Sequence, residues 1–186
     1  MLKKAILLLL LCGCSVQAQQ TQPTASVEKA LFAVEVGLVG FWAHAEMKMA
    51  SHWALRTEIG AETFTVTYHD HETETLLAPV VSVEPKWYYN LDKRLKMGKK
   101  TQGNSGNAFS VKVNYNPHFI LAGDDFVPKP NHIAILPKWS LRRQYGKHFT
   151  LETGIGIGPI FYLGDDNLYK HAETFFDGMF RIGYTF

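Results

Sequence analysis

Apolar and polar residues alternate along most of this chain, and most strictly over its last eleven residues, 176–186. Because successive side chains of a β-strand point to opposite sides, this segment predicts a strand with two different faces. One face carries Phe176, Gly178, Phe180, Ile182, Tyr184 and Phe186, and the other carries Asp177, Met179, Arg181, Gly183 and Thr185. The strand therefore has an aromatic-rich face and a polar face.

The same period of two predicts six further strands, over residues 31–43, 52–67, 75–89, 108–119, 132–143 and 148–163. In the first of them, Trp42 continues the apolar face that begins at Phe32, and Glu35 lies on the opposite face. No stretch after the N-terminal segment is apolar over 18 residues, which excludes a helical membrane protein. The pattern predicts a single all-β domain.

Charged residues gather opposite the apolar faces of these strands. A charge in a water-poor interior is costly unless it is paired, and an eight-stranded barrel is only wide enough for its own side chains. A balanced set of charges can fill such an interior as a salt-bridge network, with the apolar faces turned to lipid. The set has six acidic and six basic members: Glu35, Arg56, Glu58, Glu62, Glu84, Lys86, Lys112, Lys138, Arg142, Glu152, Asp177 and Arg181. The sequence therefore predicts a closed antiparallel transmembrane β-barrel of eight strands over residues 31–186.

Seven strands are visible in the pattern, whereas bacterial single-chain barrels have an even number. Three alternatives remain for the eighth strand. It lies within residues 24–30, or within residues 164–174, or one of the seven predicted segments contains two strands. The residues from 90 to 107 predict a basic connection that is helical near 90–100, since Leu91 and Leu95 are one turn apart and Gly98 can end a helix.

Two other barrel architectures are considered. A lipocalin-like barrel has an apolar interior, so it would expose Trp42, Trp53, Trp87 and Trp139 to water. A narrow diffusion channel or ion path is disfavoured by the balanced charges of the interior. Aromatic residues near the predicted strand ends fit a membrane-interface girdle better than a stacking site for sugars or bases: Trp53, Trp87, Tyr89, Tyr115, Trp139, Tyr184 and Phe186.

The N-terminus has the form of a secretory signal. Lys3 and Lys4 precede a short apolar run, and cleavage is expected after Ala18, with residues 19–30 as a flexible segment. Alternatively, the sequence around Cys14 resembles a lipobox. Cleavage after Ala18 removes both cysteines and two of the 19 basic residues, which leaves 17 basic against 17 acidic residues. This balance gives no reason to expect a nucleic-acid partner.

Two groups of residues are candidates for chemistry. His148, Thr150 and Glu152 share one predicted strand face and could act as base, nucleophile and orienting carboxylate in acyl-ester hydrolysis of lipid. They differ from the pattern of lipid A deacylases, because Thr replaces Ser and the Glu is too near in sequence. His69 and His71 could hold a metal with Glu72 or Glu74, although a solvated polar loop is the simpler interpretation. No cofactor is predicted.

Two resemblances add to this reading. The C-terminal strand resembles the assembly signal of Gram-negative outer-membrane barrels, which implies export and insertion by the barrel-assembly machinery. Three segments resemble a family of small, largely uncharacterised outer-membrane β-barrel proteins. They are Glu84–Leu91 with Lys93 and Arg94, Pro137–Trp139 with Arg142, Arg143 and Gly146, and Arg181–Phe186. That resemblance implies an outer-membrane location and a structural, adhesive or ligand-contacting role through outer loops.

Overall fold

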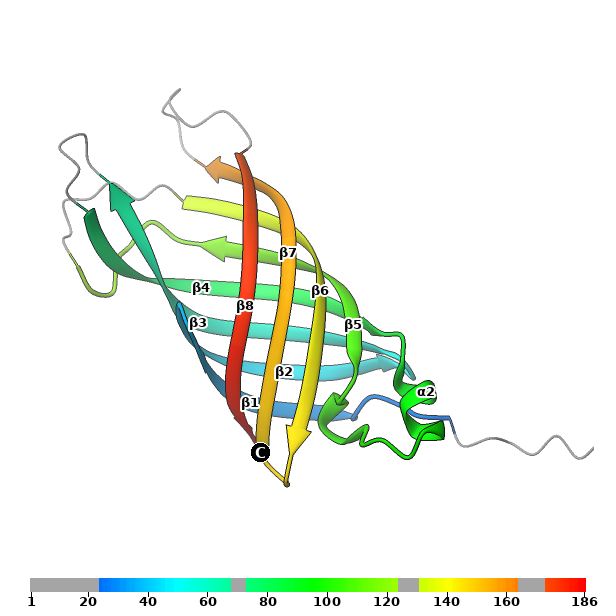
Figure 1. The fold of residues 1–186 in the computed structure, drawn as a ribbon. Helices are drawn as coiled ribbons and strands as arrows, with labels where there is room; N and C mark the ends of the chain where they lie inside the picture. The colour runs from blue at the N-terminus through cyan, green and yellow to red at the C-terminus, as the bar shows by residue number, and fades with distance from the viewer. Residues whose placement is uncertain (1–23, 68–72, 124–130, 164–172) are drawn as a thin grey trace, which may run out of the picture.

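Eight antiparallel strands pair in sequence order and close into one barrel, with β1 against β8 (Figure 1). The computed structural model describes residues 24–67, 73–123, 131–163 and 173–186. The strands are β1 Ala30–Gly37, β2 Gly40–Ala50, β3 Trp53–Thr67, β4 Thr73–Tyr88, β5 Asn107–Asn116, β6 Asn131–Tyr145, β7 Phe149–Leu163 and β8 Glu173–Thr185. The all-β class and the strand number are confirmed. Among the described residues, no helix is long and apolar enough to cross a bilayer.

The eighth strand comes from the first predicted segment, which contains two strands. β1 and β2 form a hairpin in which Gly37 pairs with Gly40 across the turn residues Leu38 and Val39. The turn reverses the parity of the inward positions, which are odd-numbered in β1 (Leu31, Ala33, Glu35) and even-numbered in β2 (Trp42, His44, Glu46). The sequence pattern runs through the turn without a break and does not reveal this change. Trp42 was expected on the outer face with Phe32, and this expectation is wrong: Trp42 is 3% exposed and points into the barrel.

The two ends of the barrel are built differently (Figure 1). At one end, here named the α2 end, lie the C-terminus, the β2–β3 and β6–β7 turns and the helix α2, Leu91–Lys96. The predicted helical connection is thus confirmed. The helix ends at Lys96 with Met97 as its C-cap, and the positive φ of Gly98 suits the glycine that follows a helix. At the opposite end, here named the far end, β3, β4, β6, β7 and β8 reach beyond the β1–β2 hairpin.

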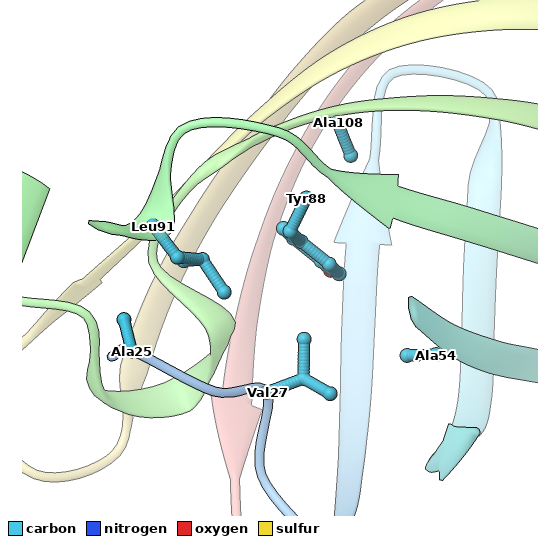
Figure 2. Packing of buried hydrophobic residues seen from close by; sticks show 6 residues of the cluster. All are labelled: Ala25, Val27, Ala54, Tyr88, Leu91 and Ala108. Carbon is cyan, nitrogen blue, oxygen red and sulfur yellow. The ribbon is translucent and has the colours of Figure 1, made fainter. Parts of the chain in front are cut away.

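A small apolar cluster closes the interior at the α2 end (Figure 2). Ala25 and Val27 precede β1 and pack with Leu91 of the α2 connection, and with inward-facing residues of three strands: Ala54, Tyr88 and Ala108. The amide of Ala25 donates to Asp92 Oδ1 at 2.7 Å, which ties this segment to α2. Residues 24–29, which the sequence analysis places in a flexible segment, are therefore packed against the barrel; the expected signal segment lies outside the described residues.

The 3-10 helix η1, Gln102–Asn104, completes this closure. Asn104 Oδ1 accepts from the Glu28 amide at 2.8 Å, and Asn104 Nδ2 donates to Glu46 Oε1 inside the barrel at 2.6 Å. The carbonyl of Gly103 accepts from Arg142 Nε at 3.1 Å. Gly103 has a positive φ, and a Cβ there would meet the end of the Gln144 side chain, so the position favours glycine. The N-terminal segment, η1 and the interior form one connected unit.

Aromatic side chains form a band outside the barrel near the α2 end. Trp53 stacks on Trp87 with ring centroids 6.2 Å apart, and Tyr89 stacks on Phe109 at 5.2 Å. Trp139 Nε1 donates to Tyr89 Oη at 3.1 Å, which links the band across the strands. Tyr184 and Phe186 continue it on β8, whereas Tyr115 lies towards the far end of β5. Most of the predicted girdle residues thus gather at one level of the barrel.

Candidate functional site

The interior of the barrel at the α2 end is filled by charged side chains at the inward positions of the strands. Of the twelve residues predicted to form this network, Glu62 and Asp177 are half-buried. The others are buried: Glu35, Arg56, Glu58, Glu84, Lys86, Lys112, Lys138, Arg142, Glu152 and Arg181. Alternation along each strand brings these residues together from β1, β3, β4, β5, β6, β7 and β8.

Glu152 on β7 is the centre of this network. One of its oxygens lies 2.5 Å from Lys86 Nζ, and the other lies 2.6 Å from Arg56 Nη2 and 2.8 Å from Arg142 Nη1. The carboxylate is 1% exposed, so its charge is balanced by these cations rather than by water. Such a group stabilises the fold only while its partners are in place.

Glu58 and Glu35 extend the network on the side of β1 and β3. Glu58 accepts from Lys112 Nζ at 2.8 Å and from Arg181 Nη1 at 2.6 Å. Glu35 accepts from Arg142 Nη1 at 3.1 Å. Arg142 therefore joins the Glu35 and Glu152 groups into one network that crosses the lumen.

Sequence reasoning missed the inward residues of β2, because that strand was not recognised. Glu46 is fully buried and accepts hydrogen bonds from Tyr88 Oη at 2.8 Å and Asn104 Nδ2 at 2.6 Å, with Arg56 Nε at 3.3 Å. Trp42 places its indole ring 3.5 Å from Arg181 Cζ, a cation–π contact inside the barrel. The signal that could have found them is the Gly37–Gly40 spacing around a two-residue turn.

The proposed catalytic group is not assembled. His148 is exposed at the β6–β7 turn, where its ring stacks on Tyr184 at 4.8 Å and its Nδ1 lies 2.7 Å from the Thr185 carbonyl oxygen. Thr150 is buried, and Glu152 is held by three cations. The carboxylate that would orient the imidazole is therefore committed to the lumen network. His69 and His71 lie outside the described residues.

One buried group has the donor set of a metal site. Ligand atoms of Glu35, His44 and Glu58 lie within 4.8 Å of one another, and neither ring nitrogen of His44 has a hydrogen-bond partner among the described residues. However, Arg142 and Arg181 already contact these two carboxylates at 3.1 and 2.6 Å. A divalent cation placed there would face both guanidinium groups, so we assign no metal to this cluster.

At the far end, the lumen is not filled by charges. A cavity of about 590 Å³ lies above the network, lined by residues of β5, β6, β7 and β8 and by the β1–β2 hairpin. Several inward positions of β4 and β6 at this level are apolar and buried: Leu76, Ala78, Val80, Ala134 and Leu136. The interior thus has a half filled by paired charges and a half with open space, where buried apolar side chains of β4 and β6 lie beside polar ones such as Asn114 and Asn116.

No protein-family model, no curated protein and no solved structure matches this chain. The functional conclusion therefore depends on the geometry of the barrel itself.

Proposed function

We propose that this chain is an integral outer-membrane β-barrel protein of a Gram-negative cell. Its role is structural, adhesive or ligand-contacting, through the connections at the far end. The single observation that carries the proposal is the distribution of side chains across the barrel wall. Charged residues are enclosed, while large apolar residues cover the outside, among them Phe32, Val34, Phe41, Ile59, Val81, Val113, Ile155 and Ile182.

A barrel in water requires the opposite arrangement. Contiguous exposed apolar surface beyond a few hundred Å² marks a membrane or partner interface in soluble proteins. Lipid accepts such a surface, and a closed barrel satisfies its backbone groups internally, which lipid demands. The aromatic band formed by Trp53, Trp87, Tyr89 and Trp139 matches the level at which such residues meet the head groups.

The orientation follows from the lengths of the connections. In outer-membrane barrels short turns face the periplasm and longer loops face outward. Here the C-terminus and two of the three connections at the α2 end fit this rule, namely the turn of Ser51 and His52 and the turn around Gly146. The exceptions are the β4–β5 connection, 89–106, at the α2 end and the β1–β2 turn at the far end. We propose that the α2 end is periplasmic and that the signal segment before residue 19 is removed on export.

The partners in this proposal are outer-membrane lipid and, during biogenesis, the barrel-assembly machinery. The amide of Phe186 donates to the Phe32 carbonyl at 2.9 Å, at the seam where β8 meets β1. A reaction at His148, Thr150 and Glu152 is not part of the proposal, because the His148 ring is held against Thr185 and Tyr184 and the Glu152 carboxylate is held by cations of the lumen.

Expression in a Gram-negative host tests the proposed outer-membrane location. The protein is expected in the outer-membrane fraction, with a heat-modifiable shift on gels that reports the folded barrel. Deleting Phe186 is expected to reduce assembly, whereas the matched control Phe186→Tyr keeps a C-terminal aromatic residue and assembles. Recovery of wild-type protein as soluble periplasmic material would contradict the proposal.

A further inference from the structure

The outer surface at the α2 end carries basic side chains that have no carboxylate partner among the described residues. The acidic residues of this surface are engaged elsewhere: Asp92 lies 3.1 Å from His52 Nε2, and Glu28 accepts from the Gly103 amide at 3.2 Å. The basic residues are exposed or half-buried: Lys29, Lys48, Lys93, Arg94, Lys96, Lys99, Lys100, Arg143 and Lys147. This end of the barrel therefore presents uncompensated positive charge.

Three of these cations meet on one side of the barrel, where the connection after α2 reaches β6. Arg94 Nη2 donates to the Lys100 carbonyl at 2.8 Å, and Lys100 Nζ donates to the Gly146 carbonyl in the β6–β7 turn. On β6, Arg143 Nη1 donates to the Gly106 carbonyl at 2.8 Å. The positive charges of Arg94 and Arg143 act on each other. We name Arg94, Lys100 and Arg143 the basic corner.

The basic corner retains donors that face no acceptor among the described residues. A guanidinium has five N–H donors; Arg94 uses two of them and Arg143 uses three, all on neutral oxygens. Both side chains are half-buried, and Lys100 is exposed, so the corner is open to the surroundings of the barrel. Guanidinium donors of this kind bind phosphate well, because the hydrogen bonds are charge-assisted.

The Arg143 guanidinium adjoins the aromatic band. Its Nη2 donates to Asn107 Oδ1 at 2.7 Å, and Asn107 Nδ2 donates to Tyr89 Oη at 3.3 Å. Trp139, which donates to the same Tyr89 oxygen, lies two outward positions along β6 from Arg143. Aromatic residues of such a band meet the lipid head groups, so the basic corner lies at the level of the lipid phosphates.

A groove on the outer wall begins at Trp139 and continues towards the far end. It has a volume of about 500 Å³, and its apolar lining comes from β5 to β8: Phe109, Pro137, Trp139, Ile155, Ile157 and Phe176. Pro137 lies roughly 20 Å along the strand from Arg143, at ~3.3 Å per residue. With a strand tilt of about 35–45°, this distance stays within the ~15 Å thickness of one leaflet of the hydrocarbon core. The groove can therefore hold an acyl chain of a lipid whose head group is at the basic corner.

We propose that this side of the barrel, from the basic corner to the groove, binds one anionic phospholipid of the leaflet at the α2 end. The phosphate accepts from Arg94 and Arg143 and lies near the charge of Lys100, while an acyl chain occupies the groove over Pro137. A zwitterionic lipid adds an ammonium group, which these cations repel, so a head group with net negative charge is preferred. The inference rests on the proposed membrane location and names the lipid class and its site.

The test uses the mature chain in vesicles of phosphatidylcholine with a minor share of phosphatidylglycerol, after insertion and heat-modifiable folding have been checked. Two preparations have the same composition, but an equal amount of brominated acyl chains is carried either by phosphatidylglycerol or by phosphatidylcholine. Brominated chains quench tryptophan fluorescence on contact. Brominated phosphatidylglycerol is expected to quench more strongly. This excess should disappear in Trp139→Phe, which leaves Trp53 and Trp87 in the band.

Charge variants locate the head group. Arg143→Gln is expected to lower the preference for phosphatidylglycerol roughly fivefold, the effect of about one basic residue at a membrane surface, whereas Arg143→Lys keeps the charge and most of the preference. Lys100→Gln removes a charge from an exposed side chain and is expected to act in the same direction. The matched control Lys48→Gln removes an exposed cation of β2, across the ring from β6, and keeps the wild-type preference.

Each outcome decides a different point. Equal quenching by the two lipids in the wild type overturns the preference for an anionic head group. An excess that persists in Trp139→Phe, or that Lys48→Gln lowers as much as Arg143→Gln, overturns the location of the site. Protection of Trp139 from both lipids means that another copy of the chain covers the groove. A folded, inserted barrel without the excess contradicts this inference alone, whereas a chain that never inserts contradicts the proposed function.

Discussion

The two halves of the barrel interior hold the same wall together by opposite means. Along β4, the inward residues near the α2 end are Glu84, Lys86 and Tyr88, whereas those nearer the far end are Leu76, Ala78 and Val80. β6 repeats the change, from Lys138 and Arg142 to Ala134 and Leu136. Along these two strands, one pattern of alternation thus supplies a polar interior at one end and an apolar interior at the other.

The difference shows how the content of a barrel sets its openness. Buried charges must lie at hydrogen-bonding distance from their partners, so the α2 half is closed by contacts such as Glu152 with Arg56 at 2.6 Å. The same half is covered by residues 24–29 and η1. Apolar side chains impose no such geometry, and the far half retains a cavity of about 590 Å³. Stability is expected to reside in the first half.

The largest effect is expected from the centre of the charged half. Glu152→Gln keeps the size of the side chain but leaves Arg56, Lys86 and Arg142 without their shared anion. Breaking a buried ionic network in this way costs about 3–5 kcal/mol, measured as the free energy of unfolding in urea from lipid vesicles. The matched control Glu62→Gln, a half-buried position at the cavity, is expected to cost less than about 1 kcal/mol. Equal losses for the two variants would erase the difference between the halves.

A smaller loss is expected from the apolar half. Leu136→Ala removes a fully buried side chain of β6, and large-to-small changes of this kind cost about 2–5 kcal/mol. We expect a value in the lower part of that range, because the substitution leaves no buried charge without a partner, and we expect no change in the heat-modifiable shift. A loss larger than that of Glu152→Gln would place the stability of the barrel in the wrong half.

Much of this contrast could be predicted from alternation alone. The period of two identified seven strand segments and the inward charges of β1 and β3 to β8, because side-chain direction in a strand is fixed by parity. The β1–β2 turn escaped notice because Leu38 and Val39 are apolar and continue the pattern, without the Asn, Asp or Pro that usually marks a turn. Because the turn was not predicted, the inward positions of Trp42, His44 and Glu46 were not predicted either.

Other features depend on strand lengths and on contacts between residues distant in sequence, which the alternation pattern does not reveal. The low wall above the β1–β2 hairpin arises because β3 and β8 extend beyond it, and strand lengths are set by pairing rather than by pattern. Parity also placed His148 on an inward face, but it precedes the first residue of β7 and turns outward to stack on Tyr184. The packing of residues 24–29 depends on Asp92 and Asn104, which are distant in sequence.

The contacts that close the α2 half are expected to matter less than its centre. Asn104→Ala removes the donor to Glu46 and the acceptor for the Glu28 amide. Loss of such buried hydrogen bonds costs about 1–3 kcal/mol, read again from urea unfolding. Because Asn104 has a φ of 56°, Asn104→Gly is the control: it keeps the backbone conformation, so a loss that persists in the glycine variant belongs to the side chain. Full recovery in that variant would mean that backbone strain, rather than the hydrogen bonds, is the cause.

The smallest effect is expected in the ionic conductance of the barrel. The α2 half, which is closed by side-chain contacts, blocks current through the whole lumen. A current through the lumen must pass the level of Glu152, Arg56 and Arg142, where the side chains are in direct contact, whatever the width of the cavity above. Planar-bilayer recording of the inserted wild-type barrel is therefore expected to show no steady conductance. The variant Leu38→Glu, which alters only the far end, is expected to show no conductance either, whereas Glu152→Gln is expected to give brief openings, because it removes the anion that holds Arg56 and Arg142 together. A large, stable and ion-selective current from the wild type would mean that the charged half is a path rather than a plug, and that the contrast between the two halves concerns permeation instead of stability.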